Sequence, residues 1–200
     1  MKIFKTVRNH KGFTLIELAI VLVIIGIILG AVLKGQDLIE NARYKKLTTQ
    51  VKQWETITWT YLDRKGYFPG DSDKDGDIKG DVKGDLDASG LSNTPTTNQL
   101  SLGSSVFYLF LGNATTKKNI IGVCAQADCT GTLGDSYTFA ENLDLSIDGT
   151  IDEGVGLVRN ATAVTATSAT WNISAATVDT VSGPWTSAAK AILYYFDKKP

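Results

Sequence analysis

The most concentrated chemistry in this 200-residue sequence is a run of aspartates between residues 70 and 90. Its opening reads D-x-D-x-D-G-D, a pattern in which alternate carboxylates converge on one cation while glycine permits the sharp turn of a calcium loop. The ligands predicted on this basis are Asp71, Asp73, Asp75 and Asp77, with Asp81 and Asp85 as candidates to complete the shell. The twelfth position holds Val82 instead of the bidentate glutamate of such a loop. The alternative is a solvated acidic loop without an ion.

Two cysteines, Cys124 and Cys129, are separated by four residues. In an oxidising compartment outside the cytoplasm this pair is expected to form a disulfide that closes a short loop. The spacing is not the C-x-x-C of redox-active pairs. The formal net charge of −1 argues against a nucleic-acid partner bound by bulk electrostatics.

An apolar run covers residues 13–33, and Glu17 is its only formally charged residue. As a helix these 21 residues measure about 31 Å, which is enough to cross the hydrocarbon core of a membrane. The preceding basic residues place the N-terminus in the cytoplasm; they are Lys2, Lys5, Arg8 and Lys11. A carboxylate inside such a run costs about 2.5–3.5 kcal/mol on insertion, so Glu17 is expected to have a functional partner.

The residues around this carboxylate read KGFTLIEL, which resembles the class III leader of type IV prepilins and type II secretion pseudopilins. The resemblance implies that prepilin peptidase cleaves between Gly12 and Phe13 and that the new amino terminus of Phe13 is methylated. Glu17 then becomes the fifth residue of the processed chain, the position of the assembly glutamate in this family. Within one chain the ammonium group of Phe13 and Glu17 lie about one turn apart, so they could pair with each other. In a stack of subunits, a neighbouring subunit's Glu17 would instead neutralise this ammonium group, because a buried charge is tolerated only when it is paired.

The function implied by the resemblance is that of a structural subunit of a type IV pilus or a type II secretion pseudopilus. Its partners would be homologous subunits, prepilin peptidase and an assembly platform in the bacterial inner membrane. The chain would wait there as a single-pass protein with a periplasmic domain and then enter the filament. The alternative is a calcium-dependent adhesin or substrate-binding minor pilin that uses the same anchor.

No catalytic residues are predicted. His10 is the only histidine, and cleavage after Gly12 would remove it. The processed chain would then lack Ser–His or Cys–His nucleophilic sites and histidine-ligated zinc.

Beyond the apolar run, the sequence stays periodic at steps of three and four, with the stripe Tyr44, Leu47, Val51, Trp54, Thr58 and Tyr61. This pattern predicts that the helix continues and packs on a domain until Gly66 and Pro69 end it. We therefore predict an α+β, pilin-like fold with a small, mostly antiparallel sheet. Its parts are a leader at 1–12, a membrane and filament-core helix at 13–33, an amphipathic continuation at 34–66, and a globular domain at 67–200 that carries the acidic loop.

Three segments allow two structures each. Residues 160–183 are rich in Thr, Ala and Ser and form either a hairpin or a surface loop. Residues 184–197 form either a helix that begins at Pro184 or a closing strand. Asp148, Asp152 and Glu153 form either turns with the nearby glycines, which we favour, or a second cation site.

Overall fold

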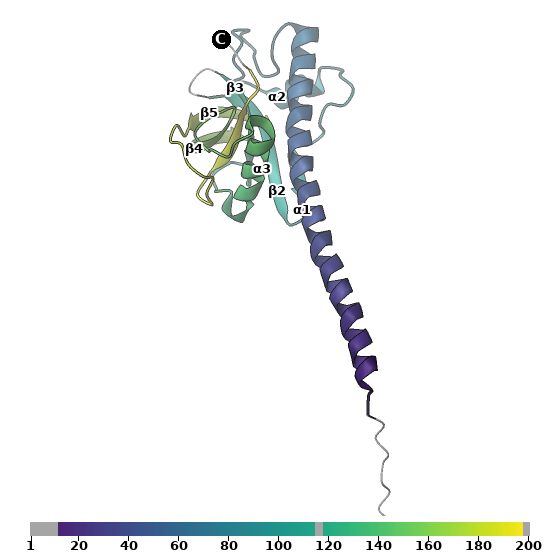
Figure 1. Ribbon diagram of the computed structural model, residues 1–200. Coiled ribbons are helices and arrows are strands. Elements are labelled where there is room, and N and C mark those ends of the chain that lie inside the picture. Colours follow the sequence, from purple (N-terminus) through teal and green to yellow (C-terminus); the bar gives the residue numbers. More distant parts are fainter. Residues whose placement is uncertain (1–11, 115–117, 198–200) are drawn as a thin grey trace, which may run out of the picture. The chain divides into compact units, whose positions relative to one another are not determined.

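A computed structural model describes residues 12–114 and 118–197 (Figure 1). The leader predicted over residues 1–12 falls outside the described residues, except for Gly12. The chain divides into two compact units between Ala42 and Arg43, within one long helix.

This helix, α1, runs from Leu15 to Lys65 and has 51 residues. Its N-terminal part is long and apolar enough to cross a membrane, and its large apolar side chains between Phe13 and Leu33 are exposed. The helix ends where Gly66 adopts a φ of +83° and its N–H donates to the carbonyl of Leu62 at 2.7 Å. Such a left-handed residue is a common helix terminator, and glycine adopts it without strain.

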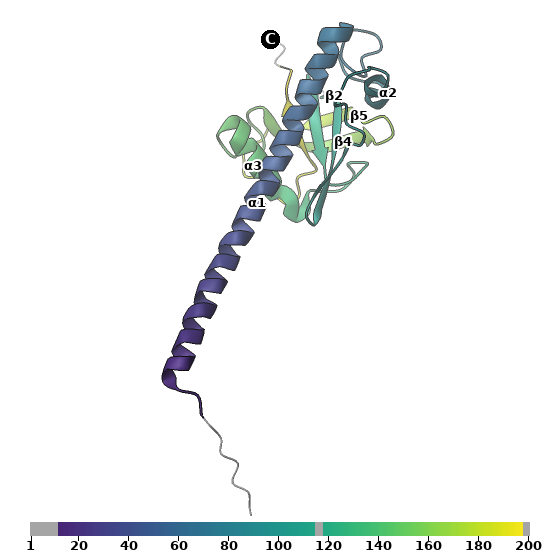
Figure 2. The ribbon, with the colours of Figure 1, turned by 90° about the vertical axis from the view of Figure 1, so that its right-hand side faces the viewer.

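From Arg43 onward, one stripe of α1 packs on the globular unit. Its buried residues are Leu47, Val51, Trp54, Thr58 and Tyr61, as the periodicity predicted. Trp54 lies 5.7 Å from Trp171 and Tyr44 lies 4.9 Å from Phe139, measured between ring centroids. Figure 2 shows this part of the helix crossing one face of the sheet.

The sheet has six strands in the order β1-β2-β3-β6-β4-β5. They are β1 (Gln99–Leu102), β2 (Ser105–Asn113), β3 (Asn119–Cys124), β4 (Val158–Thr167), β5 (Asn172–Val178) and β6 (Ala191–Tyr195). All these neighbours pair antiparallel, and β5 also pairs with β2 in parallel over two residue pairs. The predicted α+β layout of a long N-terminal helix and a mostly antiparallel sheet is confirmed.

Two apolar cores lie on opposite sides of the strands because successive strand side chains alternate. The first core joins one sheet face to α1, to the short helix α2 (Val82–Asp87) and to α3 (Tyr137–Asp148), which follows the 3₁₀ turn η1 (Gly134–Ser136). In β2, Phe107 and Leu109 enter this core while Phe110 enters the second. The second core also contains the cysteines and residues of β4, β5 and β6.

Two of the three ambiguous segments contain strands. Residues 160–183 include the hairpin formed by β4 and β5, and the segment after Pro184 contains the strand β6 rather than a helix. All five β6 residues are buried because Ile192 and Tyr194 enter the first core, whereas the other three residues of the strand enter the second. A strand buried on both faces shows no alternation, so its sequence resembles that of a buried helix.

The contact between α1 and the sheet predicts a large effect for one tryptophan. Trp54→Ala is expected to lower the free energy of unfolding by about 3–5 kcal/mol, because it leaves a cavity beside Trp171. Gln53→Ala, at the neighbouring exposed position, is the control and should change it by about 0.5 kcal/mol or less. Thermal unfolding of the full chain in detergent measures both, and equal shifts in melting temperature would contradict the packing.

Candidate functional site

The first functional group is Glu17, in the first turn of α1. Its carboxylate accepts hydrogen bonds from the N–H of Thr14 at 2.8 Å and from the Thr14 hydroxyl at 2.9 Å. The N–H of Glu17 donates to Oγ1 of Thr14 at 3.3 Å. This reciprocal pair is a capping box, in which residues three apart satisfy the free donors at a helix start.

Gly12 and Phe13 precede α1 in non-helical, exposed backbone. The peptide bond predicted to be cleaved therefore lies outside the helix, where a peptidase can reach it. Cleavage there would create an ammonium group at Phe13, next to Thr14 and about one helical turn from Glu17. The capping residue Thr14 was not singled out in the sequence analysis, although the spacing T-x-x-E is a recognised signal.

The acidic loop brings together three of the six predicted cation ligands. Asp71, Asp73 and Asp75 each place one carboxylate oxygen within 4.8 Å of the others. Asp71 is only 1% exposed and accepts N–H groups from Asp75 at 3.2 Å and from Gly76 at 3.0 Å. Burial raises the pKa of Asp71, against the lowering effect of the Gly76 N–H. The three carboxylates are oxygen donors of the kind that calcium prefers.

The other three predicted ligands make contacts that hold the loop. Asp77 pairs with Lys79 at 3.5 Å. Asp81 caps α2 by accepting the N–H of Gly84 at 2.9 Å, and Asp85 accepts the N–H of Gly70 at 2.7 Å. These three side chains shape the loop around the cluster of Asp71, Asp73 and Asp75.

Asn119, at the start of β3, fastens the acidic loop to the sheet. Its side chain accepts the N–H of Ile78 at 3.0 Å and donates to the carbonyl of Gly76 at 2.8 Å. It also donates to the carboxylate of Asp197 at 2.9 Å. Sequence reasoning missed Asn119, since its partners lie 41 to 78 residues away and no local motif marks them.

Comparison with known proteins finds a match that includes Gly12, Phe13 and Glu17. Residues 7–33 match the prokaryotic N-terminal methylation motif. With the long apolar helix, this match identifies a class III signal of the type IV pilin and pseudopilin kind. Neither the curated proteins nor the solved structures yield a match to the chain.

The class III signal implies processing by prepilin peptidase and assembly with other pilin subunits. It also points to a structural subunit rather than to an enzyme. Glu17, Phe13 and Gly12 all lie within the matched segment, so the motif and the capping box concern the same few residues.

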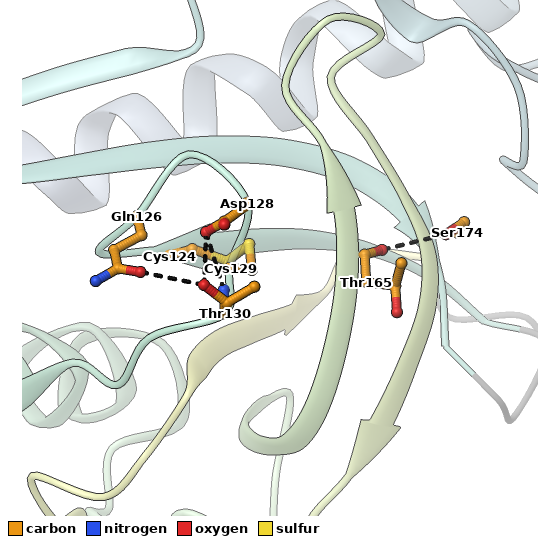
Figure 3. Close-up of a disulfide and its surroundings, with 7 residues drawn as sticks. All are labelled: Cys124, Gln126, Asp128, Cys129, Thr130, Thr165 and Ser174. Carbon is orange, nitrogen blue, oxygen red and sulfur yellow. Dashed lines mark hydrogen bonds between the residues drawn. A yellow bond between two sulfur atoms is a disulfide. The ribbon is translucent and has the colours of Figure 1, made fainter.

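Cys124 and Cys129 form the predicted disulfide, with their Cα atoms 5.2 Å apart (Figure 3). It closes a loop at the end of β3, in which the Thr130 hydroxyl donates to Asp128 at 2.9 Å and to Gln126 at 3.3 Å. Both cysteines are buried in the second core with residues of the β4–β5 hairpin. The disulfide therefore ties the end of β3 to the loop that follows it.

The acidic residues at the end of α3 and in the loop after it organise turns, as the sequence favoured. Asp148 accepts the N–H groups of Leu157 at 2.8 Å and Val158 at 2.9 Å. Asp152 accepts the N–H groups of Gly154 at 3.0 Å and Gly183 at 3.2 Å. Their carboxylates organise the backbone that leads from α3 into β4.

A buried acid that sequence reasoning missed lies beside these turns. Asp144, in α3, is 1% exposed and accepts the indole N–H of Trp185 at 2.9 Å and the N–H of Asp152 at 2.7 Å. Burial raises its pKa to about 6, although the hydrogen bonds from Trp185 and Asp152 favour the charged form and the nearby Asp148 disfavours it. Asp144 connects α3 to two later loops, and its charge depends on pH.

This carboxyl predicts a pH dependence of stability. Because the folded chain holds the proton more tightly than the unfolded chain, the contribution is present at low pH and is lost as the pH rises from 3.8 to about 6. Asp144→Asn keeps an acceptor oxygen but does not titrate, so the variant should lose less stability than the wild type across this range. Melting temperatures at several pH values measure this, with the exposed Asp135→Asn as control. Parallel profiles for wild type and Asp144→Asn would contradict the assignment.

Proposed function

We propose that this protein is a filament-forming pilin-type subunit of a type IV pilus or a type II secretion pseudopilus. Prepilin peptidase cleaves it between Gly12 and Phe13, the amine of Phe13 is methylated, and residues 13–33 pack into the shared apolar core of the filament. The observation that carries the proposal is a single carboxylate, Glu17, at the start of an exposed apolar helix inside a methylation motif.

The assembly step follows from the charge of Glu17. In the isolated chain its carboxylate is satisfied by Thr14, through one backbone and one hydroxyl donor. Cleavage adds a positive charge at Phe13, which only an anionic group such as a carboxylate can neutralise. When apolar helices stack, the Glu17 carboxylate of one copy pairs with the amine of another, and only the register that pairs them leaves no charge unpaired.

The basic leader, the apolar helix and the disulfide together support a location in the inner membrane with the globular unit in the periplasm. The basic residues before Gly12 keep the N-terminus on the cytoplasmic side, and the apolar helix anchors the chain in the inner membrane. The disulfide supports a periplasmic position for the globular unit, because such bonds persist in oxidising compartments. From there an assembly platform would lift the subunit into the filament.

Removing the charge of Glu17 tests this proposal. Glu17→Gln should abolish or greatly reduce filaments while the chain still folds and inserts into the membrane, because the amine of Phe13 loses its partner. Glu40→Gln is the matched control, since it neutralises an exposed acid of the same helix beyond the apolar run. Filament yield is measured by shearing and electron microscopy.

Mass spectrometry of the N-terminus then separates processing from assembly. The wild-type chain is expected to begin at methylated Phe13. Normal filaments from Glu17→Gln, or a wild-type chain that retains residues 1–12, would overturn the proposed function.

We further propose that the acidic loop binds calcium through Asp71, Asp73 and Asp75. The convergence of their carboxylate oxygens supports this, because the three negative charges repel one another and Lys79, which pairs with Asp75 and Asp77, offsets only part of that repulsion. Bound calcium would order the loop, which contacts the sheet through Asn119. We assign it no catalytic role.

Calcium addition gives the corresponding test. At about 10 mM, well above the dissociation constants of extracellular calcium modules, calcium should raise the melting temperature of the full chain by about 4 °C. The double variant Asp73→Asn/Asp75→Asn should lose this shift, whereas Asp87→Asn, which removes an exposed acid of α2, should keep it. A wild-type melting temperature that calcium does not change would contradict the proposed calcium site.

A further inference from the structure

The globular unit exposes large apolar side chains in one region. From Arg43 onward, the exposed large apolar residues that the structure describes are Leu145, Ile151, Val155 and Val181, which are 49%, 46%, 54% and 70% exposed. They lie at the end of α3, in the loop that follows it and in the loop after β5. We call these four residues the loop patch.

Hydrogen bonds join the two loops of the patch into one surface. The N–H of Glu153 donates to the carbonyl of Gly183 at 3.0 Å, and the N–H of Gly183 donates to Asp152 at 3.2 Å. The N–H of Asp152 in turn donates to Asp144, the residue before Leu145 in α3. These hydrogen bonds hold the two loops together, so the exposed apolar side chains form one surface. Exposed apolar surface of this kind marks an interaction site.

The surroundings of the loop patch are acidic. The stretch from residue 119 to residue 158 contains seven acidic residues and no lysine, arginine or histidine. The next residue, Arg159, is basic, and its Nε donates to the carbonyl of Gly156 at 2.9 Å. Asp152 and Glu153 belong to the first loop of the patch, and Asp179 lies two residues before Val181. The chemistry complementary to this patch is an apolar surface with basic residues beside it.

This chain has such a surface on α1. Lys34, Leu38, Ala42 and Lys45 follow one another at steps of four, four and three, which places them along one side of the helix, and Ile39 lies beside them. Leu38 is 71% exposed and Ile39 is 56% exposed. We call these five residues the helix face.

Two acids lie close to the helix face in sequence. Glu40 is on the opposite side of the helix from Leu38. Asp37 pairs with Lys34 at 3.6 Å, with both side chains mostly exposed, so the pair is weak. The helix face thus carries apolar residues between basic ends.

We propose that the loop patch of one copy of this chain docks on the helix face of a second copy. Leu38 and Ile39 cover the apolar residues of the patch, while Lys34 and Lys45 lie near its acidic residues. The contact rests on the proposed function in that filament assembly brings copies side by side. It adds an interface formed outside the apolar core of residues 13–33.

Cross-linking between two differently tagged copies tests the contact. One copy carries Leu38→Cys and the other Val181→Cys, and a short bis-maleimide is applied to sheared filaments. The control replaces Leu38→Cys with Gln36→Cys, an exposed position on the opposite side of the same helix. The Leu38–Val181 product should exceed the Gln36–Val181 product by about tenfold, and Val155→Asp should reduce it by a similar factor, since burial of one valine is lost.

Equal yields from the two cysteine pairs would overturn the docking, as would a product that Val155→Asp leaves unchanged. If the wild-type chain forms no filaments, the proposed function fails, and the same two pairs are compared in the full chain concentrated in detergent. There too, an excess of the Leu38–Val181 product supports the docking and equal yields refute it. The two failures are therefore distinguishable.

Discussion

A single negative charge, that of Glu17, lies at the start of an apolar helix. The carboxylate of Glu17 needs a partner wherever water is excluded. In the single chain Thr14 supplies two donors, and in the proposed filament the amine of Phe13 from another copy supplies a full opposite charge. The first arrangement stabilises the single subunit in the membrane, and the second favours one stacking register of the helices. The globular unit contains the C-terminal part of the same helix, from Arg43 to Lys65.

The N-terminal site and the helix could be predicted because their signals are local. The class III signal occupies consecutive residues, and the stripe from Leu47 to Tyr61 repeats at helical spacing. The disulfide also follows from two nearby cysteines, Cys124 and Cys129. Each of these features requires only residues that are close in sequence, so no knowledge of the tertiary fold was needed.

The rest depends on contacts between distant residues. Asn119 bonds Ile78 and Asp144 bonds Trp185, each 41 residues away, and β6 was ambiguous because a core covers each of its two faces. The predicted ligands Asp81 and Asp85 lie near the cluster in sequence, yet Asp81 caps α2 and Asp85 accepts the N–H of Gly70. Because β4 and β5 pair with each other within the sheet, most of residues 160–183 belongs to the fold, which the weak alternation of this segment did not predict.

Pairing between the Glu17 carboxylate of one copy and the Phe13 amine of another is measured by solid-state NMR on filaments grown from two labelled copies. One copy carries ¹⁵N-phenylalanine and the other carries glutamate with a ¹³C-labelled carboxyl group. Magnetisation transfer is expected between the Phe13 amine and the Glu17 carboxyl carbon in these mixed filaments, as for a charge-paired contact of about 4 Å. Transfer that occurs only when both labels are in the same copy would contradict this pairing.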